Sequence, residues 1–389
     1  MTRVETVRVE LGERSYDAVI GAGVLKFLGR RTRTLLADAK RAFIARDAGV
    51  PERFVEIARE SLAGEGFEVS IGTVAADERK KSLEACERLL VSMANARLER
   101  SDVVIALGGG MTGDVAGFAA ASFKRGVAVV QCPTTLLAMV DASVGGKTGV
   151  NLVTGTGLTK NLVGAFWQPV LVLADVETLT TLTPRVFRAG WGEMLKHGLI
   201  AGAFDETLWD DTIAAVTVEP SAGVGLAALI ARNVRLKAAI VAGDERETAS
   251  SDAGGRALLN LGHTYAHAME PIGHLSATGD PKDAPMEHGE AVALGLIAAA
   301  AAGQAAGSGS LAYVGRVRGA VESIGLRSRI GGLPDDSVLM GAMRHDKKAS
   351  GGRMRIVTPV DGARDGFGAR VVDEPGDDVI RAGWAAIRG

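Results

Sequence analysis

Short runs of β-branched residues alternate with helical patterns in the first half of the chain, and this alternation constrains the fold more than any other feature. The runs lie at residues 42–45, 68–71, 103–107, 127–131 and 170–173. Between the second and third runs, residues 82–93 have the apolar periodicity of an amphipathic helix. Alternating strands and helices are typical of a mostly parallel sheet covered by helices. We therefore predict a Rossmann-like α/β domain over residues 1–183.

The pattern changes at Pro184, after which strand signals nearly vanish and helical periodicity dominates. The alanine-rich stretch at residues 291–302 is too short to span a bilayer, so it predicts a buried helix. We expect an all-α second domain over residues 184–389. The active site should lie in the cleft between the two domains, because ligand sites are common at such junctions.

The run at residues 103–107 leads into a glycine-rich segment that reads Gly108-Gly-Gly-Met-Thr-Gly113-Asp114. This order predicts a strand, a tight turn and a helix, with the spacing Gly-x-Gly-x-x-Gly. Such glycines let a pyrophosphate approach the backbone, and the helix N-terminus attracts its charge. The motif alone also fits a simple tight turn, and no acid follows about 20 residues later, where the ribose-binding acid usually lies. If a dinucleotide binds here, we expect Asp47 or Glu78 to hold its ribose.

Histidines gather in one part of the second domain. Of the six in the chain, four lie between residues 263 and 288, and Glu193 lies upstream in Gly-Trp-Gly-Glu-Met-Leu-Lys. Two imidazoles and one carboxylate form a usual catalytic zinc set, which leaves a position open for a substrate oxygen. A lone histidine is more often a core or surface residue, but the clustering favours a metal site. We predict the ligands Glu193, His263 and His288, with Zn²⁺ as the ion and Co²⁺ as the alternative.

Composition limits the class of partner. The formal net charge of −2 gives no electrostatic reason to expect nucleic acid or an anionic membrane. Two isolated cysteines, Cys86 and Cys132, fit a reducing cytoplasm better than a disulfide framework. The first ten residues alternate apolar and charged side chains, as in a strand, and do not form a signal peptide. We expect a cytoplasmic protein with a small-molecule substrate.

A longer block carries a family resemblance. Residues 124–135 read Lys-Arg-Gly-Val-Ala-Val-Val-Gln-Cys-Pro-Thr-Thr, residues 141–151 read Asp-Ala-Ser-Val-Gly-Gly-Lys-Thr-Gly-Val-Asn, and residues 160–164 read Lys-Asn-Leu-Val-Gly. With the glycine loop and the histidine cluster, these segments resemble the 3-dehydroquinate synthase family of sugar phosphate cyclases. The matches run in order over most of the chain. The resemblance implies conversion of 3-deoxy-arabino-heptulosonate 7-phosphate to 3-dehydroquinate through transient oxidation by NAD, loss of phosphate, re-reduction and aldol closure.

The resemblance also implies roles for single residues. His267, one helical turn after His263, matches an acid/base group near the C5 oxygen, with support of the metal ligand as the alternative. Asp141 and Lys196 match residues that order the ring hydroxyls. The positions that match groups around the substrate phosphate are Lys147, Asn161, Asn260 and Lys348.

Two further sets follow from the same resemblance. Lys237 and Arg256 match the pair that binds the substrate carboxylate, and Arg125 matches a residue that reaches the phosphate from a neighbouring subunit, which implies a homodimer. The positions that match NAD contacts, in addition to Asp47, are Glu78, Lys81, Gly109, Gly110, Gly113, Asp114, Thr134, Thr135, Lys147, Lys160, Thr178, Leu179, Thr181 and Leu182.

Three segments are longer than is usual in the family, namely residues 152–159, 247–255 and 275–286. The second is rich in glycine and serine, which predicts a flexible loop. The first and third flank elements that would face the substrate. The sequence therefore does not decide between the family's usual substrate and related ones. A retained carboxylate clamp argues against valiolone-type and deoxy-inosose cyclases, because two cations without an anion are unfavourable in a cleft. An aminodehydroquinate synthase, a metal-dependent NAD alcohol dehydrogenase and a catalytically silent binding homologue remain as alternatives.

Overall fold

The computed structural model describes residues 4–75, 77–155, 157–217, 219–223, 225–249, 255–348, 354–363 and 366–389, and it describes the side chains of these residues except 345–348. The chain forms two compact units. The first consists of residues 1–182 with 220–242, and the second of residues 183–219 with 243–389. A single cut near residue 183 does not separate them, because most of helix α7 (Leu226–Gly243) belongs to the first unit.

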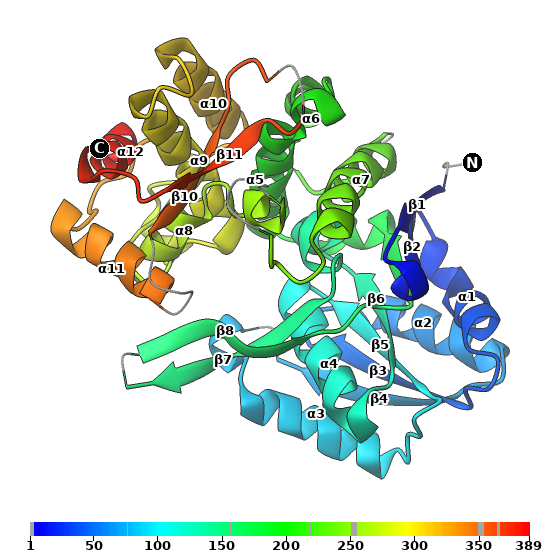
Figure 1. Cartoon of the computed structure of the whole chain (residues 1–389). Helices are drawn as coiled ribbons and strands as arrows, with labels where there is room; N and C mark the ends of the chain where they lie inside the picture. Colours follow the sequence, from blue (N-terminus) through cyan, green and yellow to red (C-terminus); the bar gives the residue numbers. More distant parts are fainter. Residues whose placement is uncertain are drawn as a thin grey trace. The chain divides into compact units, whose positions relative to one another are not determined.

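The first unit is built on a sheet whose seven described strands run in the order β1-β2-β9-β6-β5-β3-β4 (Figure 1). The strands are β1 (Glu5–Val9), β2 (Tyr16–Gly21), β3 (Arg41–Asp47), β4 (Glu68–Val74), β5 (Val103–Gly108), β6 (Ala128–Pro133) and β9 (Leu171–Asp175). β1 pairs antiparallel with β2, and the other neighbours pair parallel. The mostly parallel sheet, its five predicted strands and the N-terminal strand are confirmed; β2 was not predicted.

Helices cover both faces of this sheet. Along β5, Val103, Ile105 and Leu107 pack in one core with residues of α1 (Leu28–Leu35) and α2 (Glu52–Gly64). Val104 and Ala106 pack in the other core with residues of α3 (Leu83–Asn95) and α4 (Gly110–Ser122). Because successive strand residues point to opposite faces, a continuous apolar run supplies both cores. The predicted helix after Ser82 is confirmed as α3.

A two-stranded hairpin, β7 (Lys147–Thr154) and β8 (Gly157–Phe166), stands apart from the main sheet (Figure 1). Its inner face includes Val150, which is fully buried against residues of α3 and α4. The hairpin was not predicted, because glycine, asparagine and lysine weaken its strand signal and β8 is largely exposed. The described residues of the first long segment, 152–155 and 157–159, lie at the tip end of this hairpin.

The described part of the second unit is helical apart from the hairpin β10 (Arg355–Pro359) and β11 (Ala369–Asp373). Its helices are α5 (Pro184–Ala201), α6 (Leu208–Ala215), α8 (His263–Met269), α9 (His288–Ala305), α10 (Leu311–Ser323), α11 (Asp336–Lys348) and α12 (Asp377–Ile387). Helix α9 packs against α5, α8, α10 and α12. Its residues 289–303 are all buried, which confirms the predicted buried helix.

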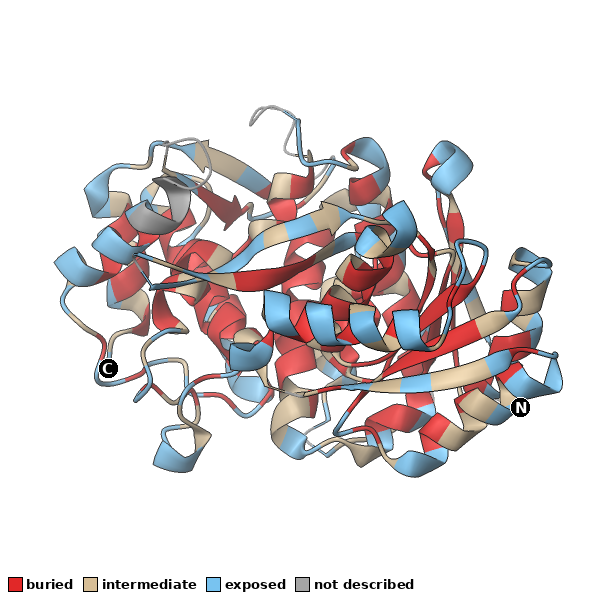
Figure 2. Cartoon of the chain, turned by 90° about the horizontal axis from the view of Figure 1, so that it is seen from below, coloured by how far each residue is buried: buried red, intermediate tan, exposed pale blue. Residues whose placement is uncertain are grey.

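Burial follows the expected amphipathic pattern on outer helices, which appear in Figure 2 as ribbons banded in red and pale blue. Within the described part of the chain, none of the helices combines the length and the apolar character that crossing a bilayer requires.

Candidate active site

Three helices of the second unit bring the predicted metal ligands together. Glu193 lies on α5, and His263 and His288 are the first residues of α8 and α9. One ligand atom from each lies within 4.8 Å of the others. Both imidazoles turn Nε2 toward the same oxygen, Oε1 of Glu193, at 3.6 Å for His263 and 3.3 Å for His288. Two nitrogens and one carboxylate oxygen around one point are a donor set that suits Zn²⁺.

Glycines beside the ligands allow this convergence. A Cβ on Gly192 would lie 2.1 Å from the carbonyl oxygen of Gly289, and a Cβ on Gly289 would lie 1.8 Å from that of Ala189. Both distances exclude a side chain, so α5 and α9 cross with their backbones in contact. A Cβ on Gly295 of α9 would likewise lie 2.2 Å from the carbonyl oxygen of Gly262, which precedes His263. Each of the three ligands therefore sits next to a glycine that permits a close backbone approach.

The second nitrogen of each imidazole is held by an acceptor. Nδ1 of His263 lies 3.1 Å from the carbonyl oxygen of Leu261, and Nδ1 of His288 lies 2.5 Å from Oε1 of Glu270, at the end of α8. Acceptors at Nδ1 keep the proton there and leave Nε2 for a metal. Sequence reasoning missed Glu270. Its helical spacing, three residues after His267, was the available signal.

Lys196 forms a buried ion pair with the carboxylate ligand. Its Nζ lies 2.5 Å from Oε2 of Glu193, and both side chains are only 1% exposed. The ammonium therefore occupies one oxygen and leaves the other facing the imidazoles. Lys196 was predicted to order substrate hydroxyls; in the structure its contact is with the ligand carboxylate.

The two ligand imidazoles differ in charge. Burial, with help from the Lys196 ammonium, lowers the pKa of His263 to about 3, so this ring is neutral. Burial also lowers the pKa of His288, but Glu270 and Glu193 outweigh it and raise the pKa to about 10. Metal binding at Nε2 of His288 would therefore release a proton.

His267 lies beside this centre. It follows His263 on α8, and its ring centroid is 5.6 Å from that of His263 and 6.2 Å from that of His288. It is half-buried. The position suits either of the roles considered for it, proton transfer or support of a ligand.

In the first unit, the glycine loop has the predicted form. β5 ends at Gly108, Gly109 precedes α4, and the helix starts at Gly110. No side chain among the described residues caps α4, so its first N–H groups can bind an anion. A Cβ on Gly113 would lie 2.7 Å from Oε1 of Gln131, so this glycine lets α4 pack against β6.

The two candidates for the ribose differ in their surroundings. Asp47 is 9% exposed, and its carboxylate accepts hydrogen bonds from the backbone of Gly49 at 2.8 Å and from Oγ1 of Thr112 at 2.9 Å. It thereby joins the end of β3 to the first turn of α4. Glu78 is exposed, and its carboxylate accepts a hydrogen bond from Asn151 at 3.0 Å.

A buried lysine joins α4 to the hairpin. Nζ of Lys81 lies 2.6 Å from Oδ2 of Asp114 and donates to Oδ1 of Asn161. The backbone N–H of Asn161 in turn donates to Oδ1 of Asn151 at 2.9 Å. Lys147 and Lys160, also on the hairpin, are exposed.

The predicted threonines lie after β6 and β9, which are neighbours in the sheet. Oγ1 of Thr178 lies 3.4 Å from the carbonyl oxygen of Thr134, and Oγ1 of Thr181 donates to the carbonyl oxygen of Thr178 at 2.8 Å. Oγ1 of Thr135 accepts from the backbone of Ala138 at 3.2 Å. Leu179 is fully buried and Leu182 half-buried.

Lys237 and Arg256, the predicted carboxylate clamp, lie in different units. Nζ of Lys237 donates to the backbone oxygen of Asp141 at 2.6 Å and to its carboxylate, so two predicted substrate contacts bind each other. Arg256 is 2% exposed and donates from Nη1 to the carbonyl oxygen of Glu245 at 2.7 Å.

The remaining predicted residues are more scattered. Asn260 is close to Glu247, with Nδ2 3.4 Å from Oε1. Arg125 is exposed, with a left-handed backbone of φ 64°. Lys348 ends α11, and its side chain lies outside the described residues, as do residues 250–254 of the predicted flexible loop.

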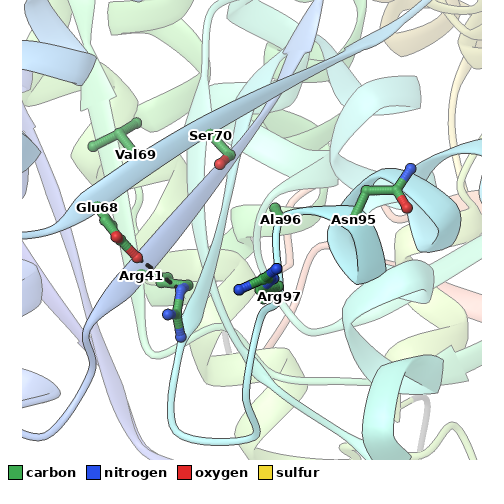
Figure 3. Close-up of a pocket in the computed structure, with 7 residues that line it drawn as sticks. All are labelled: Arg41, Glu68, Val69, Ser70, Asn95, Ala96 and Arg97. Atoms are coloured by element: carbon green, nitrogen blue, oxygen red, sulfur yellow. Dashed lines mark ion pairs between the residues drawn. The ribbon is translucent and has the colours of Figure 1, made fainter.

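A surface pocket of about 340 Å³ lies elsewhere in the first unit (Figure 3). Its lining includes Arg41 and Glu68, which form an ion pair of 2.8 Å, and Arg97. Arg41 and Glu68 begin the parallel strands β3 and β4, whereas the glycine loop follows the end of β5. The pocket therefore lies at the amino ends of the parallel strands, whereas the candidate dinucleotide site lies at their carboxyl ends.

Known proteins match both units. The family models described as 3-dehydroquinate synthase N-terminal and C-terminal match residues 71–189 and 190–349. The 3-dehydroquinate synthase of Nitrobacter hamburgensis is 45% identical over 362 residues, which cover 90% of this chain and 89% of the relative.

Solved structures agree in fold. A 2-deoxy-scyllo-inosose synthase complexed with carbaglucose-6-phosphate, NAD⁺ and Co²⁺ is 25% identical, with a TM-score of 0.79 and coverage of 97% of this chain and 99% of the other. The 2-epi-5-epi-valiolone synthase of Streptomyces hygroscopicus subsp. jinggangensis, with NAD⁺ and Zn²⁺ bound, is 25% identical, with a TM-score of 0.75 and coverage of 97% of both chains. By its sequence over nine-tenths of its length and by its fold, the chain belongs to the 3-dehydroquinate synthase family.

Proposed function

We propose that the chain converts 3-deoxy-arabino-heptulosonate 7-phosphate into 3-dehydroquinate and inorganic phosphate, a step of the shikimate pathway to the aromatic amino acids. It is an enzyme of the carbon–oxygen lyase class. The observation that carries this proposal is the 45% identity to a 3-dehydroquinate synthase over 90% of the chain. The 2-deoxy-scyllo-inosose synthase and the 2-epi-5-epi-valiolone synthase match at 25% identity.

The cofactors are NAD and one divalent metal, Zn²⁺ or Co²⁺. Glu193, His263 and His288 would hold the metal, which when bound supplies Lewis acidity toward substrate oxygens. The N-terminus of α4 would hold the pyrophosphate of NAD, which supplies reversible oxidation of a carbinol and is regenerated in each turnover. Further NAD contacts would come from Glu78, Lys81, Asp114, Lys160 and the threonines after β6 and β9.

The chain's own residues then bind the substrate and move its protons. His267 would transfer a proton at the C5 oxygen, close to the metal ligands. Oxidation there makes the neighbouring C–H more acidic, so that phosphate can leave. The groups that would bind the leaving phosphate are Lys147, Asn161, Asn260, Lys348 and, from the second subunit of a homodimer, Arg125.

The carboxylate end is bound by different residues. Arg256 would bind the substrate carboxylate with its planar fork, and Lys237 would assist it. The contact of Lys237 with Asp141 favours a shared role, in which Asp141 orders a ring hydroxyl and fixes the ammonium. We place the enzyme in the cytoplasm, which its two isolated cysteines favour.

Turnover with substoichiometric NAD tests the proposal. The purified protein, with zinc and catalytic NAD, should release one phosphate for each 3-dehydroquinate, with no build-up of NADH absorbance. The same assay with the amino analogue, and with sugar phosphates that lack a carboxylate, separates the other cyclases. Faster turnover of any of these, or one NADH per product without phosphate, would contradict the assignment.

A further inference from the structure

A buried carboxylate outside the proposed metal ligands joins helices α5 and α9 of the second unit. The side chain of Glu290, on α9, has no exposed surface. Its oxygens accept hydrogen bonds from Arg185 on α5, at 2.9 Å from Nη2 and 3.2 Å from Nε, and from Nη2 of Arg188 at 3.4 Å. Oε2 also accepts the backbone N–H of Glu287 at 3.0 Å, which closes a capping box at the start of α9.

The guanidinium of Arg185 extends the network to the segment before α9. Nη2 donates to the carbonyl oxygens of Asp283 at 2.6 Å and Pro285 at 2.7 Å. Both residues belong to one of the three segments that are longer than usual in the family, residues 275–286. Arg185, which lies on α5, therefore contacts α9 and the long segment at the same time.

These contacts are close in sequence to two of the proposed metal ligands. Glu290 follows His288 by two residues on α9, and Arg185 precedes Glu193 by two helical turns on α5. The glycine contact sets the distance between α5 and α9. Because glycines have no side chains to interlock, this contact does little to prevent one helix from sliding or rotating against the other. A charge-assisted ion pair with two hydrogen bonds between the helices restricts both their sliding and their rotation.

We propose that Glu290 and Arg185 are positioning residues, which hold His288 against Glu193 so that the two present their donor atoms to one metal ion. The inference rests on the metal centre of the proposed function. In this arrangement the long segment braces the start of α9 through the carbonyl oxygens of Asp283 and Pro285.

Zinc affinity of the metal-free protein tests the proposal. For Glu290→Gln and Arg185→Lys, we expect the zinc dissociation constant, measured by competition with a chromophoric chelator, to rise about 10- to 100-fold, the usual range for residues that orient ligands. The absorption spectrum of the Co²⁺ form should also change, because the ligand geometry changes. The Glu290→Gln protein should regain much of its turnover at saturating zinc.

Arg388 offers a matched control. Its guanidinium binds the carboxylate of Asp336 at 2.7 Å and the carbonyl oxygens of Leu333 and Pro334 at 3.0 and 2.9 Å, which is the same pattern away from the ligands. Arg388→Lys and Asp336→Asn should leave the zinc dissociation constant and the Co²⁺ spectrum unchanged, whatever they do to the melting temperature.

The outcomes separate the two proposals. If the unaltered protein binds no zinc, the metal centre itself is wrong. The positioning role is wrong if the unaltered protein binds zinc and both variants, Glu290→Gln and Arg185→Lys, fold and have zinc dissociation constants within twofold of its value. It is also wrong if neither variant folds, as judged by circular dichroism, because the network then serves folding alone.

Discussion

At the scale of single residues, one hydrogen bond decides which imidazole nitrogen of His288 is available. Glu270 accepts from Nδ1, so Nε2 faces Glu193. In the sequence, Glu270 is marked only by its helical spacing from His267, which ordinary surface carboxylates share. It became recognisable only when the short helix α8 placed it beside the first turn of α9.

Replacing this carboxylate should weaken metal binding without unfolding the protein. For Glu270→Gln, we expect zinc affinity to fall about 10- to 100-fold, because a neutral amide orients the imidazole less strongly and makes it less basic. Chelator competition measures the change. Glu322→Gln, on the exposed side of α10, is the control, and equal affinities for the two variants would refute the role of Glu270.

Both cysteines should resist thiol reagents at alkaline pH. Burial raises the pKa of Cys86 to about 11 and raises that of Cys132 further. An ordinary thiol, with a pKa of about 8.5, is largely ionised at pH 9, whereas these two thiols stay protonated and buried. An Ellman assay at pH 9 should show slow reaction of the native protein and rapid reaction of two thiols in denaturant. Rapid reaction of native protein would contradict the buried positions.

At the scale of elements, the crossing of α5 and α9 brings Glu193 and His288 together. The crossing depends on Gly192 and Gly289, at positions where no Cβ fits. The sequence displayed both glycines beside the ligands, but nothing in it indicated that they face each other. Contacts between elements far apart in the chain have no local signature.

A single methyl group at this crossing should damage both stability and metal binding. For Gly289→Ala, we expect the free energy of unfolding to fall by about 1–3 kcal/mol or more through overpacking, with weaker zinc binding. Urea unfolding of the metal-free protein measures the first effect. Gly319→Ala on α10 is the control, because no described atom lies within 4 Å of the added Cβ and a helical alanine should stabilise by roughly 0.5–1 kcal/mol. Equal effects in the two variants would show that the helices do not cross in contact.

Elements were predictable where local chemistry decides them. The five parallel strands followed from continuous β-branched runs that feed two cores, and α3 and α4 followed from periodicity and the glycine turn. The hairpin β7–β8 was missed because β8 is largely exposed and because the hairpin holds glycines where its strands approach closely. One is Gly164, whose Cβ would lie 2.0 Å from the backbone carbonyl oxygen of Thr148. The proposed metal ligands stand out by residue type and clustering, but Glu270 and the Arg185–Glu290 pair depend on tertiary contacts.

At the scale of the whole molecule, a metal ion held by three helices should stabilise the fold as well as support catalysis. Ligand binding to the folded state alone adds about 2.7 kcal/mol at a free concentration of 100 times the dissociation constant. We expect a chelator to abolish turnover and lower the melting temperature, and zinc or cobalt to restore both. Calorimetry with and without chelator measures the effect, magnesium serves as the control ion, and full activity in a metal-free preparation would exclude the metal centre.

The chain leaves the first unit at residue 182, returns to it for residues 220–242 and leaves again. During synthesis, the first unit therefore cannot be completed when the last strand of its sheet emerges from the ribosome. It must wait for α7, and by then α5 with Glu193 has already been made, while His263 and His288 have not. The donor set is complete only after residue 288, so the nascent chain lacks a complete metal site until about three-quarters of it has been made.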